Sequence, residues 1–265
     1  MHNFSSKTLG ALLLTTLLVV AACGGSTATT PAVGMTGNPT SGGAGPTSNP
    51  LVSGSDLGLN GAEAAFANIT SYKFSMTLAG GTFGSSLSAL GGGAGASGDA
   101  AFTMTGTIVE GANPAADITM GSMHEIEVGG FDYIDMGTGS FIKTATTAGS
   151  GLASSFSPST MFSSMVDAST YDGYTKVGSE TKNGVMTDHY QANQTILGQY
   201  GTMAGVTGAT WSADVWVAQN GGYPVSMNIT AKAADSSVAY QVLFDITNVN
   251  DSSNSVTAPT NVTSY

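Results

Sequence analysis

The sequence predicts a mainly β protein of the α+β class, built on one strongly curved antiparallel sheet with short helices over one side. The first observation is alternation, because runs of alternating apolar and polar residues recur between positions 71 and 248 and are typical of half-buried strands. The second is glycine, because paired glycines between these runs predict tight turns and hairpin order. The third is that helical patterns do not alternate with the strands, as they would in a parallel sheet. Together these patterns predict about nine or ten strands.

The folded part of the chain is expected to begin at residue 56. Apolar residues recur at a helical spacing within 56–69. Alternate residues from Tyr72 to Leu78 are then apolar, which predicts a strand with one buried face. Residues 80–99 are rich in glycine, serine and alanine and predict a mobile loop.

The remaining strands fall into two groups that are separated by a break. The first group is predicted at 100–110, 115–128, 131–136 and 140–144, and the second at 172–181, 184–192, 210–219, 223–234 and 237–248. Tight turns are predicted at Gly129-Gly130, at Gly137-Thr138-Gly139 and at Gln219-Asn220-Gly221-Gly222. Most strands therefore follow their neighbours through short connections.

Three further segments do not follow the strand pattern. Within 145–170, Ser157 is a candidate N-cap, Pro158 suits the first helical position, and an apolar group at 161–166 predicts a lid-like helix. Residues 195–204 predict a weaker helix or a loop. The final residues, 251–265, are rich in Ser, Thr and Asn and predict a frayed C-terminal tail.

Cys23, the only cysteine of the chain, follows a short apolar run and two alanines. Lys7, the apolar core from Leu9 to Val20 and the small residues give 1–22 the layout of a secretory signal. The apolar core is too short to span a bilayer. Val20-Ala21-Ala22-Cys23 resembles a bacterial lipobox, in which the cysteine sulfur receives a diacylglyceryl group and becomes the first mature residue. The alternative is a chance cysteine after an ordinary signal. Residues 23–55 are then an acylated cysteine and a flexible Gly/Ser/Thr/Pro linker, with a reach of about 30 Å.

The charge balance argues against nucleic acid as a partner. The chain carries 17 acidic residues against 6 basic ones, all of them lysines, and its formal net charge is −11. An acidic surface without arginine is poorly suited to phosphates. It also repels anionic headgroups, so we expect the lipid anchor on Cys23 to hold the protein at the membrane. With Cys23 acylated, the chain has no disulfide and depends on its core for stability.

Features along the whole predicted domain resemble one family. An opening helix leads into Ser71-Tyr72-Lys73-Phe74-Ser75-Met76, and a lid-like segment contains Met161-Phe162. The central strands include the run Glu125 to Ile134, and a late hairpin joins Trp211-Ser212-Ala213-Asp214-Val215-Trp216-Val217 to Gly222-Tyr223-Pro224-Val225. In these features, residues 56–250 resemble the LppX/LprG-type bacterial lipoproteins, relatives in fold of the LolA/LolB lipoprotein carriers.

The resemblance implies a LolA-like half-barrel of about 9–11 strands, with short helices covering its concave side. It also implies that acyl chains are held on that side and that lipids are bound or shuttled without chemical turnover. The glycine-rich loop at 80–99 and the lack of arginine depart from the family's pattern. No arginine is therefore present to clamp a lipid phosphate.

An apolar cavity is also supported by composition. The chain has 12 methionines beside 10 phenylalanines, and flexible thioether side chains adapt to irregular apolar surfaces. The alternative is that methionine fills an ordinary core. Strand alternation and the predicted lid together select the candidate cavity residues Phe74, Met76, Leu78, Phe102, Met104, Ile108, Ile118, Met120, Met161, Phe162 and Met165.

Motifs for other chemistries are weak. Residues 93–98 have the G-x-G-x-x-G spelling but lack the strand before and the helix after that a dinucleotide site needs. His124 and Glu125 are expected on opposite faces of a strand, which argues against a shared metal ion, and Glu125 and Glu127 are expected to be solvated. Asp188-His189 has no serine at a spacing that marks a nucleophile. We therefore predict no metal, no cofactor and no enzymatic activity.

The sequence predicts a monomeric lipoprotein, anchored on the extracytoplasmic face of a bacterial envelope. It would bind a lipid or other hydrophobic ligand in the half-barrel, for presentation or transfer. The alternative is a β-rich envelope scaffold or interaction lipoprotein that holds no ligand. Detection of co-purifying lipid would separate the two.

Overall fold

The computed structural model describes a large part of the predicted domain. The described residues are 61–62, 65–66, 68–80, 101–146, 151, 153 and 168–263. They all belong to the unit Leu51–Tyr265. The predicted signal and linker, most of the loop at 80–99, and the lid-like segment with Met161, Phe162 and Met165 lie outside the described residues.

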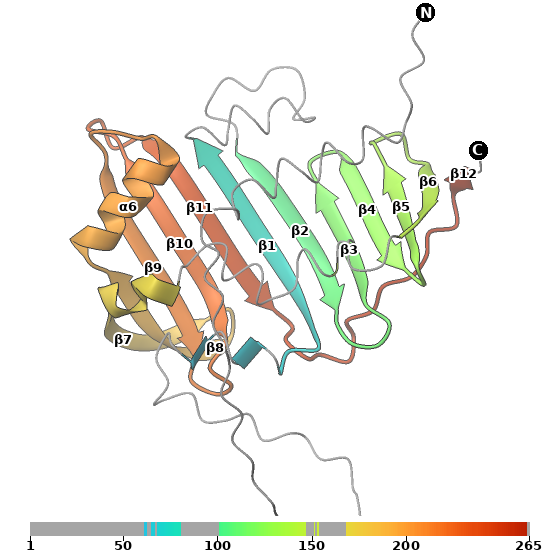
Figure 1. Cartoon of the computed structure of the whole chain (residues 1–265), viewed down its shortest axis with the longest axis horizontal. Helices are drawn as coiled ribbons and strands as arrows, with labels where there is room; N and C mark the ends of the chain where they lie inside the picture. Colours follow the sequence, from blue (N-terminus) through green and yellow to red (C-terminus); the bar gives the residue numbers. More distant parts are fainter. Residues whose placement is uncertain are drawn as a thin grey trace, which may run out of the picture. The chain divides into compact units, whose positions relative to one another are not determined.

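The described residues form twelve strands in one sheet (Figure 1). The strands are β1 (Ser71–Gly80), β2 (Phe102–Val109), β3 (Ala115–Met120), β4 (Met123–Val128), β5 (Phe131–Asp135), β6 (Phe141–Ala145), β7 (Tyr174–Lys182), β8 (Val185–Ala192), β9 (Thr210–Ala218), β10 (Pro224–Lys232), β11 (Val238–Thr247) and β12 (Val262–Thr263). A 3-10 helix, η2 (Ala168–Gly173), precedes β7, and the helix α6 (Gln194–Ala204) lies between β8 and β9.

The strand order shows how the two groups of strands meet. It runs β12-β6-β5-β4-β3-β2-β1-β11-β10-β9-β8-β7, and all neighbours are antiparallel except β12 and β6. Strand β1 pairs with β2 on one side and with β11 on the other, so it joins two meanders that run outward in opposite directions. The predicted fold class is confirmed: a mainly β, curled open antiparallel sheet of the LolA-like half-barrel type.

Glycines end several strands where the sequence indicates turns. Gly129 and Gly130 both have positive φ between β4 and β5, as the predicted turn requires. The prediction of one strand over 115–128 is wrong, because the chain reverses after Met120 and forms the β3–β4 hairpin. Gly121 makes this possible, since its φ of 59° is in the left-handed region that glycine tolerates.

The predicted weak helix at 195–204 is confirmed as α6. The Asn193 side chain caps it by accepting hydrogen bonds from the backbone N–H groups of Thr195 and Ile196, and Gly205 ends it in the left-handed conformation. The Tyr200 hydroxyl lies 2.8 Å from the Tyr174 hydroxyl at the start of β7, where the two are hydrogen-bonded. Figure 1 shows α6 across the sheet over β9 and β10. The predicted strand at 172–181 begins two residues later, at Tyr174, because η2 extends to Gly173.

The main hydrophobic core lies on the face of the sheet that α6 covers, and a smaller cluster lies on the other face. The smaller cluster contains Ile126, Tyr133 and Phe141, with Val256 and Val262 packed against it. Part of the segment expected as a frayed tail is therefore paired and packed: Val262 and Thr263 form β12 beside β6.

Candidate functional site

The predicted cavity residues that the structure describes lie on one face of three adjacent strands. We call these eight residues the apolar strip: Phe74, Met76, Leu78, Phe102, Met104, Ile108, Ile118 and Met120. The register aligns them across the strands, with Met76 opposite Met104 and Met104 opposite Met120. The shared face follows from the two-residue period that the sequence shows. Their role in ligand binding stays a prediction.

Burial changes along the strip. Near one end, Ile108 and Ile118 are fully buried, and Met104 is 2% exposed. At the other end, Leu78, Phe102 and Met120 are only partly buried. Leu78 and Phe102 face each other across β1 and β2, so the open end belongs to adjacent strands rather than to one frayed strand. The strip therefore passes from a packed core to a partly accessible apolar surface.

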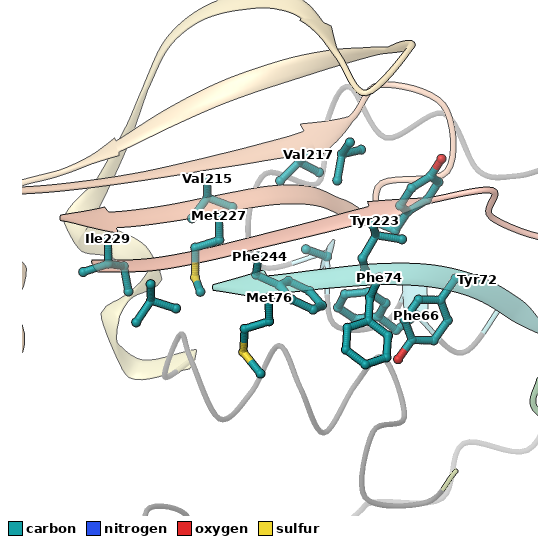
Figure 2. Close-up of a cluster of buried hydrophobic side chains, with 14 of the residues drawn as sticks. Phe66, Tyr72, Phe74, Met76, Val215, Val217, Tyr223, Met227, Ile229 and Phe244 are labelled. Carbon is teal, nitrogen blue, oxygen red and sulfur yellow. The ribbon is translucent and has the colours of Figure 1, made fainter. Parts of the chain in front are cut away.

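The strip continues across β11, β10 and β9. Phe244 lies opposite Met76 on one side and Met227 on the other, and Met227 lies opposite Val215. Figure 2 shows these side chains with Phe74, whose ring centroid is 6.3 Å from that of Phe244. The sequence prediction did not include these residues, although the alternation within 223–234 and 237–248 could have found them.

Gly106 makes room for the aromatic ring of the strip. It pairs with Phe74 on β1 and with Ile118 on β3. A Cβ at this position would lie 2.7 Å from Cε1 of Phe74 and 2.8 Å from the carbonyl oxygen of Asp117. The Phe74 ring therefore occupies the space that a side chain at 106 would need.

The same face becomes acidic one strand beyond β3. Ile118 lies opposite Glu125 on β4, Ala116 lies opposite Glu127, and Glu127 lies opposite Asp132 on β5. We call Glu125, Glu127 and Asp132 the acidic row. The expectation that Glu125 and Glu127 are solvated is wrong for Glu127, which is 7% exposed and accepts a hydrogen bond of 2.8 Å from the backbone N–H of Ala153.

Burial raises the pKa of two carboxyls of this row, Glu125 and Asp132. Burial, followed by the charges of Asp132 and Glu127, raises the pKa of Glu125 to about 7. Burial also raises the pKa of Asp132, against a hydrogen bond from the Thr146 hydroxyl that lowers it. At neutral pH the Glu125 carboxyl is therefore partly protonated and can donate a hydrogen bond. In the described part of the chain, no group of three or more His, Cys, Asp or Glu could hold a metal ion.

The other motifs considered from sequence are built into the sheet. His124 lies on the face opposite Glu125, and its Nε2 is 2.7 Å from Oδ1 of Asp117. Asp188 is buried and accepts hydrogen bonds from Lys176 and Ser179. The Ser179 hydroxyl thus donates to a carboxylate, and it lies on the opposite face of the β7–β8 pair from His189. Asp188 and His189 therefore do not form a nucleophile site with Ser179.

The two tryptophans of β9 lie on opposite faces, as their spacing predicts. Trp216 is buried, stacks on His189 with ring centroids 4.5 Å apart, and donates a hydrogen bond of 2.6 Å to Glu180. Trp211 is only partly buried and lies on the α6 side, against the ring of Tyr240. No helix among the described residues is both long and apolar enough to cross a membrane.

The described residues form a curled, open antiparallel sheet with one apolar face, which is the half-barrel arrangement that the sequence predicts. The chain is similar in structure to LprF from Mycobacterium bovis, with 10% identity, coverage of 76% of this chain and 93% of that one, and a TM-score of 0.42. It is similar to the Mycobacterium tuberculosis lipoprotein LppX, with 14% identity, coverage of 74% and 94%, and a TM-score of 0.42. A LolA superfamily protein from Nitrosomonas europaea has 8% identity, coverage of 74% and 92%, and a TM-score of 0.23.

These similarities include LppX, a protein of the type that the sequence resembles. No protein-family model matches the chain, and no curated protein matches it. Because the identities and TM-scores are low, the similarities assign no ligand to this chain.

Proposed function

We propose that this chain is a lipid-anchored envelope lipoprotein that binds a lipid or other hydrophobic ligand on the apolar strip, for presentation or transfer without chemical turnover. The observation that carries the proposal is the change in burial along the strip. Leu78, Phe102 and Met120 form a partly accessible apolar surface that continues into a closed core. An acyl chain that packs on this surface would continue the apolar core at its open end.

The energy of such binding comes from burying apolar surface. At about 25 cal/mol per Å², a few hundred Å² of buried acyl chain contributes several kcal/mol before the costs of association. Met76, Met104 and Met120 lie side by side in the register across β1, β2 and β3. Their unbranched side chains can adapt to acyl chains of different shape, which supports a ligand class rather than one exact ligand.

The acidic row supports a choice of headgroup. It continues the face of the strip on β4 and β5, and the chain has a net charge of −11 without any arginine. The ionised carboxylates of this row repel a phosphate, and carboxyl oxygens can accept hydrogen bonds from hydroxyl or ammonium groups. Amphiphiles with neutral or cationic heads are therefore favoured over anionic phospholipids.

Lipid extraction and native mass spectrometry test ligand binding. We expect lipid to co-purify with the wild-type chain and to be strongly reduced in Met120→Lys, which places a charge at the open end of the strip. Thr119→Lys is the matched control, because Thr119 is exposed on the opposite face of the same strand and should leave loading unchanged. Equal loading of both variants, with both folded by circular dichroism, would rule out the strip as the site. A wild-type chain without lipid would favour the scaffold alternative.

Cell fractionation tests the anchor separately. Cys23→Ser removes the predicted acylation site, so we expect the protein to leave the membrane fraction. Continued membrane association of Cys23→Ser would contradict the proposed anchor. It would not affect the proposal of ligand binding, which the lipid-loading experiment tests.

A further inference from the structure

A groove lies between α6 and the beginning of β9, and it uses no residue of the apolar strip. Its volume is about 350 Å³. It is lined by Gln194, Gly198, Gly201, Thr210 and Trp211, and by the apolar residues Leu197 and Ala209. This volume lies at the lower end of the range for small-molecule sites. The groove could therefore hold one small ring compound, but not a long acyl chain.

Two helix glycines keep the groove open. A Cβ at Gly198 would meet nothing within 4 Å, so packing does not require glycine there. Glycine is nevertheless a poor helix former, so its presence lowers the stability of α6 without any gain in packing. At Gly201, a Cβ would lie 3.3 Å from Nε1 of Trp211, so this glycine makes room for the indole. Bare helix backbone therefore forms one wall of the groove.

Trp211 lines the same groove. Its indole lies close to Gly201 and next to the ring of Tyr240, whose centroid lies 5.5 Å away. The side chain is only partly buried, in contrast to Trp216 on the other face of β9. An aromatic ring offers a large apolar contact surface that needs little ordering when a ligand binds.

The polar groups of the groove are neutral. Gln194 and Thr210 are exposed and provide an amide and a hydroxyl, which can both donate and accept hydrogen bonds. None of the lining residues is charged. A ligand that fits these walls has one flat apolar face, several hydroxyl groups and no charge. We propose that the α6 groove binds a neutral sugar ring, stacked on Trp211.

A single-tryptophan design tests this proposal on the full-length chain. Trp216→Phe leaves Trp211 as the only tryptophan, and its fluorescence is titrated with the methyl glycosides of glucose, galactose and mannose. Saturation-transfer NMR on each glycoside measures contact independently in the wild-type chain. We expect a saturable signal with at least one glycoside in both experiments, and a loss of the saturation-transfer signal in Trp211→Leu, which removes the aromatic face.

Gly198→Leu tests the groove itself. Leucine is a good helix former and enters open space, so we expect the variant to fold and to bind at least about tenfold more weakly. Gln199→Leu is the matched control, because Gln199 is exposed on α6 but does not line the groove, and it should bind as the wild type does. Undiminished binding by Gly198→Leu, or no saturable binding of any glycoside by the wild type, would overturn the proposal. Glucuronate binding as tight as that of methyl glucoside would overturn the choice of a neutral ligand. Lipid loading should be unchanged in Gly198→Leu, which separates this test from that of the apolar strip.

Discussion

The apolar strip and the acidic row occupy the same face of the same sheet, yet they differ in chemistry from one strand to the next. Ile118 on β3 is fully buried, and its partner across the strand pair is Glu125 on β4. Both positions follow the same two-residue alternation and both point to the side of the main core. Alternation therefore predicts which side of a sheet a residue faces, but it does not predict how polar that side remains.

The boundary between the two regions has a consequence for binding. On the strip side, burial removes apolar surface from water and is favourable. On the acidic side, burial must be offset by hydrogen bonds or by protonation, as the Ala153 N–H does for Glu127 and the raised pKa does for Glu125. A ligand along this face would meet an apolar region first and a region of hydrogen-bonding carboxyls next.

Placing a carboxylate on the apolar strip should have the largest effect on stability. Ile118→Asp places an unpaired carboxylate in a fully buried position and removes the packing of Ile118. We expect the free energy of unfolding to fall by more than about 4 kcal/mol, measured by urea denaturation. Thr119→Asp, on the exposed face, should change it by less than about 1 kcal/mol. Equal effects of the two variants would contradict the boundary.

Neutralising the acidic row should stabilise the protein in a pH-dependent way. The pKa of Glu125 rises from 4.5 to about 7 on folding, so the folded state holds more protons than the unfolded state between these values. Wild-type stability should therefore fall as the pH rises through this window, and the contribution of Glu125 is favourable only below it. Glu125→Gln should be more stable than the wild type at pH 8 by up to about 3 kcal/mol, with little difference at pH 4.

Urea denaturation at several pH values measures this difference. Asp172→Asn is the control, because it removes one carboxylate at an exposed position outside the acidic row. A Glu125→Gln profile parallel to that of the wild type would show that Glu125 is not the titrating group.

Removing the acceptor of the Ala153 bond should have an intermediate effect. Glu127→Ala leaves the Ala153 N–H without this carboxylate, which should cost about 1–3 kcal/mol of stability. Glu127→Gln retains an oxygen acceptor and removes charge, so it should cost less. Amide hydrogen exchange at Ala153 should be faster in the alanine variant than in the glutamine variant. Identical exchange rates would mean that this hydrogen bond does not hold Ala153.

A change within the strip should have the smallest effect. Met104→Leu nearly conserves volume, so we expect a loss of less than about 1.5 kcal/mol in unfolding free energy. Met136→Leu, at a position that is 51% exposed, is the control and should be close to neutral. A loss as large as that of Ile118→Asp would show that the strip is a tightly specified core rather than an adaptable apolar surface.

Much of the fold and part of the site could be predicted because they depend on local patterns. The two-residue alternation predicted that Phe74, Met76 and Met104 share one face. The glycine pair at 129–130 predicted a turn. The break at Gly121 was missed because apolar residues continue on both sides of it and hide the hairpin. The pairing of the tail could not be predicted, since polar residues around Val262 give no sign of the distant β6 strand.

The sequence by itself determined the class of fold, the common face of the strip residues and the charge that argues against nucleic acid. These features depend on residue type and on spacing of a few positions along the chain. Only the tertiary structure decided that Ile118 meets Glu125, that Glu127 is buried against Ala153, and that α6 and β9 leave a groove beside Trp211. The physical reason is that burial and contact depend on register and packing between segments far apart in the chain, which local periodicity does not encode.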